Sequence, residues 1–330
     1  MDIDKLINKG ALKSKVRIVP NTWKGHQSNW SQRFDFGNDN EETIASGLAR
    51  VFGISNPNSD LFHMAIDGDG RERRRICTLH SSSLLAFLFF SGISKENILK
   101  INGIEYDKCF FEIQNKVFPD AKSTDKPSNV DVVLYSTKSN SLLFIESKFT
   151  EYLSHGKTFA SDKYYDTIKS IINICNLNLH IEQGAKVKSF TDTRTGSKIC
   201  LKGAKNNEYL EGFKQAVSHI IGIVTGEPND HNPKEYRDIL GKKPIMAFSS
   251  IIFDVKNINN AEKDKYDKFY NSTIGRLNNQ GIFKSIFSNP QFKYHEVEVF
   301  ENLLTYQGLI KDNPQYQLPS AFMGYYRIIE

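Results

Sequence analysis

The chain has 330 residues, 39% of them hydrophobic and 25% charged, and its net charge is +5. These values are typical of a soluble protein with a buried core, and the small positive charge permits nucleic-acid binding without requiring it. No apolar run reaches the roughly 18–20 residues that cross a bilayer, and the start Met-Asp-Ile-Asp-Lys is unlike a signal peptide. We therefore expect a cytoplasmic protein with no membrane partner. Its four widely spaced cysteines predict neither disulfides nor a zinc site.

Residues 1–80 are predicted to form a helical cap. A helix is expected from Glu41 to Phe52, where apolar residues recur at helical spacing. The aromatic and polar stretch 23–33 could contact the DNA backbone or pack its two tryptophans against the core, and we favour packing. Arg71, Arg73 and Arg74 form a basic run that could bind phosphates, although such runs more often form a solvated surface.

Two further elements are predicted before residue 120. Residues 84–90 are apolar on all sides and follow three serines that can cap a helix, so they should form a buried helix. Residues 109–114 are the most strand-like part of the next segment. Glu112 interrupts this apolar strand, and it is either an exposed acid at a sheet edge or part of a functional site.

Residues 129–149 predict a β-hairpin. The arms 130–135 and 142–147 are rich in β-branched, aromatic and other apolar residues, and a polar Thr-Lys-Ser-Asn turn separates them. A turn centred between Lys138 and Ser139 defines the register of the two strands.

This register predicts a cluster of two carboxylates and a lysine. Asp131 lies directly opposite Glu146, which brings their Cβ atoms to roughly 4.5–5.5 Å. Lys148 follows two residues later and points to the same face as Glu146. Facing carboxylates need a compensating charge, and Mg²⁺ is often held by one or two carboxylates plus a substrate phosphate. The cluster is suited to phosphodiester hydrolysis, with Asp131 and Glu146 binding Mg²⁺ and Lys148 orienting the attacking water.

The layout Asp131…Glu146-Ser147-Lys148 resembles the PD-(D/E)XK, or restriction-endonuclease-like, nuclease superfamily. More narrowly, the continuation Glu-Ser-Lys-Phe-Thr-Glu is similar to a group of bacterial restriction endonucleases. One departure from the superfamily motif is that Val130, and not proline, precedes Asp131. The resemblance implies an αβββαβ core, a Mg²⁺ cofactor that Mn²⁺ can replace, and an additional acid in the metal site, for which Glu112 is the candidate.

The segments after the lysine strand complete this core. Helices are expected over 161–175 and 210–224, and residues 245–254 are nearly all apolar, as in a strand covered on both faces. Gln215 and His219 lie four residues apart on one face of the second helix. In the resembled family this helix flanks the active site and contributes a glutamine, so Gln215 is a candidate catalytic residue. His219 could also belong to the site, or be a partly buried structural histidine.

Basic residues between these two helices predict a DNA-contacting loop. Residues 186–205 hold six lysines and arginines against one aspartate, and turn residues divide the segment into something like a hairpin. Lysine and arginine contacts with phosphate supply most non-specific affinity for DNA. The residues assigned this role are Lys186, Lys188, Arg194 and Lys198.

We therefore predict an α/β protein with a restriction-endonuclease-like αβββαβ core, in which helices flank a mixed central sheet. The core spans about 81–255 of a single elaborated domain, and residues 256–330 are expected to be peripheral α/β decoration that continues through 294–300 to a helix at 300–310. The expected function is Mg²⁺-dependent cleavage of foreign DNA by a type II-like restriction endonuclease, with a homodimer and a cognate methyltransferase as partners to test. The alternatives are a repair or recombination nuclease, a nuclease acting on RNA, and a non-catalytic nucleic-acid-binding module.

Overall fold

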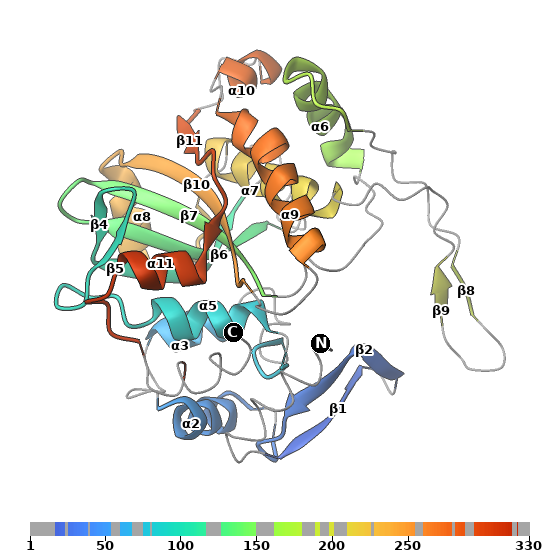
Figure 1. Ribbon diagram of the computed structural model, residues 1–330, viewed down its shortest axis with the longest axis vertical. Coiled ribbons are helices and arrows are strands. Elements are labelled where there is room, and N and C mark those ends of the chain that lie inside the picture. The colour runs from blue at the N-terminus through green and yellow to red at the C-terminus, as the bar shows by residue number, and fades with distance from the viewer. Residues whose placement is uncertain are drawn as a thin grey trace.

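The computed structural model describes residues 17–23, 26–38, 40–53, 60–67, 75–79, 81–116, 127–149, 162–179, 189–191, 198–200, 210–225, 228–254, 260–278, 281–287, 294–318 and 322. Their main feature is a six-stranded mixed sheet with helices on both faces (Figure 1). This confirms the expected class, an α/β protein with a mixed central sheet.

The central sheet has the strand order β11-β10-β7-β6-β5, and β12 also pairs with β10. Within this sheet β5, β6 and β7 pair antiparallel with one another in that order. Strand β10 pairs parallel with β7 and with the two C-terminal strands, β11 and β12. The strands are β5 (Lys108–Asn115), β6 (Ser128–Ser136), β7 (Ser141–Lys148), β10 (Ile245–Ile252), β11 (Val297–Val299) and β12 (Leu304–Thr305). Strands β7 and β10 are buried almost throughout, as expected for continuous apolar runs covered on both faces.

The hairpin formed by β6 and β7 has the predicted register. Its turn occupies residues 137–140, and Val132 lies opposite Ile145 while Tyr135 lies opposite Leu142. The paired ladder ends at Val132 and Ile145, one step before Asp131 and Glu146. The two carboxylates are therefore at the point where the strands separate.

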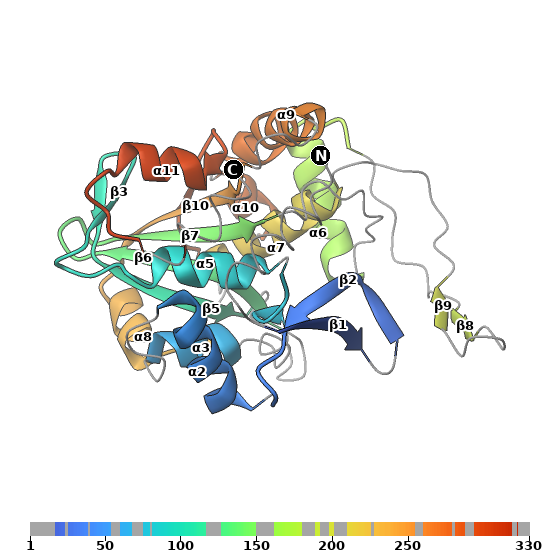
Figure 2. The same ribbon diagram turned by 60° about the horizontal axis from the view of Figure 1, so that its bottom comes forward.

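One face of the sheet packs against helices from both ends of the chain. These are α2 (Glu41–Phe52), α3 (Asp60–Asp67), α5 (Ser82–Phe90) and α11 (Tyr306–Asp312), and Figure 2 shows α5 lying along β6 and β7. Every residue of α5 from Leu84 to Phe90 is buried, which agrees with its prediction as a helix that is apolar on all sides. Ser81 caps it, because its Oγ accepts a hydrogen bond from the Leu84 amide at 2.8 Å.

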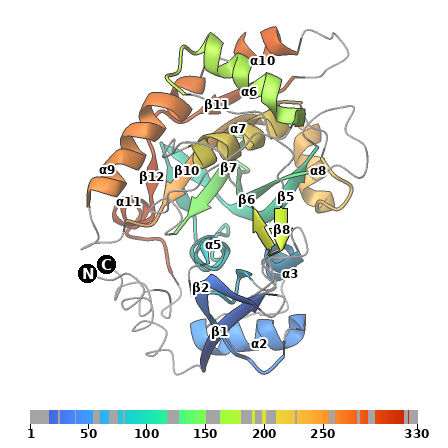
Figure 3. The same ribbon diagram turned by 90° about the vertical axis from the view of Figure 1, so that its right-hand side faces the viewer.

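The opposite face carries α7 (Leu210–Thr225), the helix predicted to flank the site (Figure 3). Its apolar stripe, which includes Phe213, Val217 and Ile220, packs with residues of β6 and β7 in the hydrophobic cluster on this face of the sheet. The other elements of this side are α6 (Asp162–Ile174), α8 (Lys234–Gly241), α9 (Asn260–Phe269), the π-helical turn η2 (Tyr270–Ile274), the 3₁₀ turn η3 (Gly275–Leu277) and α10 (Gly281–Ile286).

The N-terminal segment is not purely helical, which corrects the prediction of a helical cap. Strands β1 (Ile18–Trp23) and β2 (His26–Phe34) form an antiparallel pair before α2. Strand β1 contains the β-branched residues Ile18, Val19 and Thr22, which favour an extended backbone and pair with β2. The Phe34 amide also donates a hydrogen bond to the Cys77 carbonyl at 2.9 Å, which ties β2 to the segment before α5.

Two further hairpins have short strands. One is formed by β3 (Leu99–Ile101) and β4 (Ile104–Tyr106), and the other by β8 (Ser189–Thr191) and β9 (Lys198–Cys200). The second lies within the basic segment 186–205, where the sequence predicted a hairpin.

Part of the segment predicted as peripheral decoration belongs to the central sheet. Strands β11 and β12 both pair with β10, and α11 begins at Tyr306, later than the predicted helix start at residue 300. The helix starts there because Thr305 ends β12 and caps it, with Oγ1 accepting from the Gly308 amide at 3.0 Å. The Tyr306 ring then packs edge-on against Phe89 of α5, with 4.9 Å between ring centroids.

Within the part of the chain that the structure describes, no helix combines the length and apolarity needed to cross a membrane.

Candidate functional site

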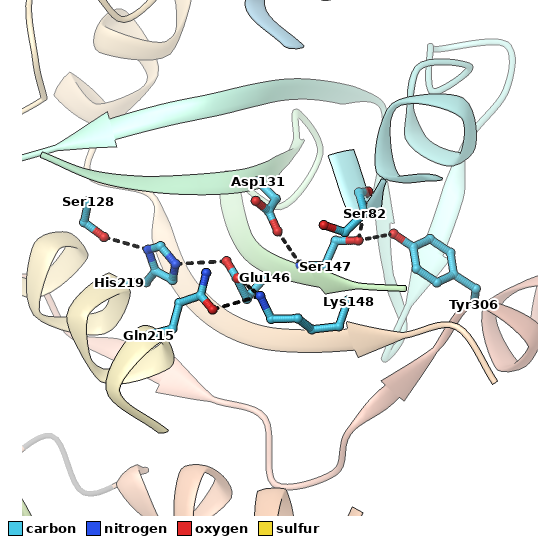
Figure 4. Close-up of polar contacts among 9 residues, drawn as sticks. All are labelled: Ser82, Ser128, Asp131, Glu146, Ser147, Lys148, Gln215, His219 and Tyr306. Atoms are coloured by element: carbon cyan, nitrogen blue, oxygen red, sulfur yellow. Dashed lines mark hydrogen bonds and ion pairs between the residues drawn. The ribbon is translucent and has the colours of Figure 1, made fainter. Parts of the chain in front are cut away.

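Asp131 joins β6 to β7 through its side chain at the place where the two strands separate. Its Oδ2 accepts a hydrogen bond from the Ser147 backbone amide at 2.7 Å (Figure 4). A carboxylate oxygen therefore accepts from a β7 amide two residues beyond Ile145, the last residue of that strand paired with β6. This contact orients the carboxylate beside Glu146 and Lys148, the residues on either side of Ser147.

Glu146 is a buried carboxylate with different partners on its two oxygens. Its side chain is 3% exposed, Oε1 accepts from Lys148 Nζ, and Oε2 lies 2.9 Å from His219 Nε2. Burial is the strongest single influence and raises the pKa of Glu146, but the nearby Lys148 and His219 together hold that pKa well below its usual range. The carboxylate is therefore ionised at neutral pH.

Lys148 lies between Glu146 and helix α7. Its Nζ donates to Gln215 Oε1 at 2.8 Å as well as to Glu146, and its side chain is 12% exposed. The strand alternation correctly predicted that Lys148 and Glu146 share a face. These contacts hold the ammonium group against the carboxylate.

Helix α7 contributes two polar side chains, one turn apart, to the same place. Gln215 contacts Lys148, and His219 contacts Glu146 (Figure 4). His219 is buried, and its Nδ1 lies 2.6 Å from the Ser128 hydroxyl at the start of β6. The 3.6-residue period placed both residues on one helix face, but only the packed structure shows which strand residue each one meets.

The contact between Glu146 and His219 is close but poorly directed. Glu146 Oε2 and His219 Nε2 are both buried, and neither has a hydrogen-bond partner among the described residues, although the two atoms lie 2.9 Å apart. The distance is that of an ion pair, while the orientation fails the requirements of a hydrogen bond. Buried polar atoms without a hydrogen bond are rare and call for a specific explanation.

Glu112 occupies the register position level with Asp131 on the neighbouring strand. The pairs Phe111–Val132 and Ile113–Val130 lie on either side of it. Its φ is 50°, an uncommon value for a residue other than glycine, and Phe111 and Ile113 pack into different hydrophobic clusters. The register is unchanged across Glu112, so the facing of the side chains reverses here without an inserted residue. Acidic residues occupy successive strands β5, β6 and β7 at this level.

The opposite face of β7 holds a contact that the sequence did not reveal. The Ser147 hydroxyl lies 2.7 Å from the Tyr306 hydroxyl and 3.4 Å from the Ser82 carbonyl. Donation from Tyr306 to Ser147 and from Ser147 to Ser82 satisfies all three groups. The strand that carries Glu146 and Lys148 is thus fixed to α5 and α11.

Helix α7 approaches the strands closely at Gly222. A Cβ atom at this position would lie 3.3 Å from Ser128 Cβ and 3.4 Å from Asn115 Cβ. We expect Gly222→Val to destabilise the protein by about 1–3 kcal/mol, because its branched side chain overfills this contact. Urea unfolding of Gly222→Val, Gly222→Ala and the unaltered protein measures how the loss of stability depends on side-chain size. The loss in Gly222→Ala should be small, because alanine gains about 1 kcal/mol of helix propensity over glycine. Equal stabilities for the three proteins would contradict the close approach.

The predicted DNA-contacting residues lie largely outside the described part of the chain. This applies to Arg71, Arg73, Arg74, Lys186, Lys188 and Arg194, and for Lys198 the structure describes the backbone of β9 but not the side chain.

Among the described residues, no three His, Cys, Asp or Glu side chains are grouped so as to hold a metal ion. The donors present are the carboxylates of Asp131 and Glu146, with the imidazole of His219 beside Glu146. A Mg²⁺ site of one or two carboxylates, completed by water and substrate phosphate, does not require a group of three such side chains. The buried Glu146 Oε2, which lacks a hydrogen bond, is consistent with such a cation.

Comparison of the chain with protein-family models, curated proteins and solved structures gives no match.

Proposed function

We propose that the protein is a metal-dependent endonuclease that hydrolyses DNA phosphodiester bonds, acting as a type II-like restriction endonuclease with the restriction-endonuclease-like core. The observation that carries this proposal is the position of the largely buried Lys148 between the buried Glu146 and Gln215, next to the point where Asp131 binds the lysine strand. A buried ion pair contributes little net stability. Its presence at the diverging ends of two strands is better accounted for by chemistry on a charged substrate.

The order of elements supports the proposal. Helix α5 precedes three antiparallel strands, helix α7 follows them, and β10 then returns parallel to β7. These elements are compatible with the αβββαβ order that the motif resemblance implied, with the β3–β4 hairpin inserted before β5, α6 and the β8–β9 hairpin before α7, and α8 before β10.

Asp131 and Glu146 would hold the Mg²⁺ ion, and Mn²⁺ could replace it. When bound, the ion supplies positive charge that polarises the scissile phosphate and lowers the pKa of a bound water. Glu146 suits this role because it is ionised, and because Lys148 contacts only one of its two oxygens. Glu112, level with Asp131 on β5, is the candidate for an additional acid.

Lys148 would orient the attacking water and offset negative charge on the phosphate as the transition state forms. Its ammonium group is held in place by Glu146 Oε1 and Gln215 Oε1. Gln215 is therefore a positioning residue that limits the rotation of the lysine side chain. Phosphate contacts from Arg71, Arg73, Arg74, Lys186, Lys188, Arg194 and Lys198 would supply affinity for the DNA backbone.

The proposal is tested by incubating the purified protein with unmethylated plasmid and phage DNA, with Mg²⁺ or with EDTA. Discrete fragments that require Mg²⁺ would support a sequence-specific endonuclease, and protection of methylated DNA would support a cognate methyltransferase. A smear would indicate non-specific cleavage, and cleavage of RNA alone would favour the RNA alternative. Binding of DNA without cleavage would contradict the proposal and favour a non-catalytic module.

Asp131→Asn should separate the structural role of this residue from its proposed role in binding metal. The amide oxygen of asparagine can still accept from the Ser147 amide, so we expect the stability to change by less than about 1 kcal/mol. The loss of negative charge should lower Mg²⁺-dependent cleavage by about 10²-fold or more. Urea unfolding and cleavage rates measured on one preparation check both. Unchanged cleavage would remove Asp131 from the proposed site.

A further inference from the structure

The poorly directed contact between Glu146 and His219 has the geometry of two ligands of one cation. Octahedral Mg²⁺ and similar ions bind donors at about 2.1 Å, so donors at adjacent positions lie about 3 Å apart. Glu146 Oε2 and His219 Nε2 are 2.9 Å apart, are both buried, and lack a hydrogen bond within the described structure. Neither atom would remain unsatisfied if both faced the same metal ion.

The other ring nitrogen of His219 has the partner that a metal-binding histidine requires. Nδ1 lies 2.6 Å from the Ser128 hydroxyl. When Nδ1 carries the proton and donates to Ser128, the lone pair of Nε2 faces Glu146. A hydrogen bond of this kind fixes the tautomer and the ring orientation of histidines that bind metals.

We propose that His219 is a ligand of the metal ion, and that it gives the site a preference for Mn²⁺ over Mg²⁺. This inference rests on the proposed function, since it concerns the ion that Glu146 would hold. Mg²⁺ is bound mainly by carboxylate and water oxygens, whereas imidazole nitrogen favours transition metals. Mn²⁺ accepts both kinds of donor, so an imidazole beside the Glu146 carboxylate strengthens its binding relative to that of Mg²⁺.

A simple ion pair is the competing explanation of the same contact. In that arrangement a protonated His219 neutralises Glu146, and both nitrogens act as donors. A protonated imidazole has no lone pair for a metal and repels a cation. The two explanations therefore predict opposite effects of removing the ring on metal affinity.

The experiment measures metal binding directly on the metal-free, full-length protein. Calorimetric titration gives the affinities for Mn²⁺ and Mg²⁺, and pulsed electron paramagnetic resonance of bound Mn²⁺ detects coupling to a directly bound ¹⁴N nucleus. We expect ¹⁴N coupling in the unaltered protein. In His219→Ala this coupling should disappear, with a loss of Mn²⁺ affinity of about 10-fold or more and a smaller loss for Mg²⁺.

His63→Ala is the matched control. His63 also forms an ion pair with a glutamate, Glu41, but it is half exposed and lies on α3, at the opposite face of the sheet. Its removal should change neither the affinity nor the ¹⁴N coupling. The spectrum of the unaltered protein keeps the test valid even if His219→Ala folds poorly.

Glu146→Ala separates failure of this inference from failure of the proposed function. Mn²⁺ binding that depends on Glu146 but shows no ¹⁴N coupling, and that survives or strengthens in His219→Ala, would overturn the role of His219 and leave the nuclease proposal standing. If the unaltered protein binds no Mn²⁺, or if Glu146→Ala binds it equally well, both the role of His219 and the proposed nuclease function would be overturned.

Discussion

Lys148→Ala is expected to abolish cleavage while leaving DNA binding largely intact. The ammonium group is the cationic side chain hydrogen-bonded to Glu146 at this site, and it would orient the water and offset transition-state charge. Loss of such a group lowers rates by about 10³-fold or more. Binding should persist, because contacts to many phosphates supply most affinity for DNA. Cleavage rates with Mg²⁺, and fluorescence anisotropy of labelled DNA without metal, measure the two effects separately.

Lys138→Ala is the control for this substitution. Lys138 lies in the turn of the same hairpin, is largely exposed and forms an ion pair with Glu105. Removing it changes the net charge of the protein by the same amount, so it should leave the cleavage rate unchanged. Cleavage retained in Lys148→Ala would refute the assignment of the catalytic lysine. Equal losses of cleavage rate in both variants would show that the loss comes from the lower net charge of the protein.

Glu146→Ala is expected to produce the largest loss of stability among the site variants. Its carboxylate neutralises Lys148 and contacts His219 in a buried environment. Removing one partner of a buried ion pair leaves a charge without compensation and costs about 3–5 kcal/mol. Urea unfolding in the absence of metal measures this cost without a contribution from ion binding.

The double substitution Glu146→Leu with Lys148→Met tests whether the pair exists for stability. Apolar side chains of similar length remove both charges together, and such replacements are often neutral or stabilising. We therefore expect the double variant to be more stable than Glu146→Ala and to be inactive in cleavage. A double variant as unstable as Glu146→Ala would show that the ion pair supports the fold.

The hairpin that carries the site was predictable from local patterns. Two apolar strands around a symmetric polar turn leave one register that buries both, and alternation then places Lys148 on the face of Glu146. Helix α7 was likewise predictable from its apolar stripe at helical spacing. Helix α5 and strand β10 were predictable from continuous apolar runs, which mark elements covered on all sides. The DNA specificity and partners expected from the resemblance remain predictions.

Other features depend on how distant segments pack. The sequence places Gln215 and His219 on one helix face, but the height and rotation of α7 decide that they meet Lys148 and Glu146 respectively. The absence of a side chain at Gly222, where a Cβ atom would lie 3.3 Å from Ser128 Cβ, contributes to this placement. The helical cap expected over residues 1–80 missed β1 and β2, because their pairing joins two segments that each lack a clear strand pattern.

The sequence by itself determined the strand pair, its register and the shared face of Glu146 and Lys148, because these follow from side-chain alternation and a short turn. Tertiary structure alone decided that Asp131 binds the Ser147 amide, that Ser147 meets Tyr306, and that His219 faces Glu146. These contacts join groups separated by 16 to 159 residues along the chain. Their geometry depends on packing of the helices against both faces of the sheet, which no local pattern encodes.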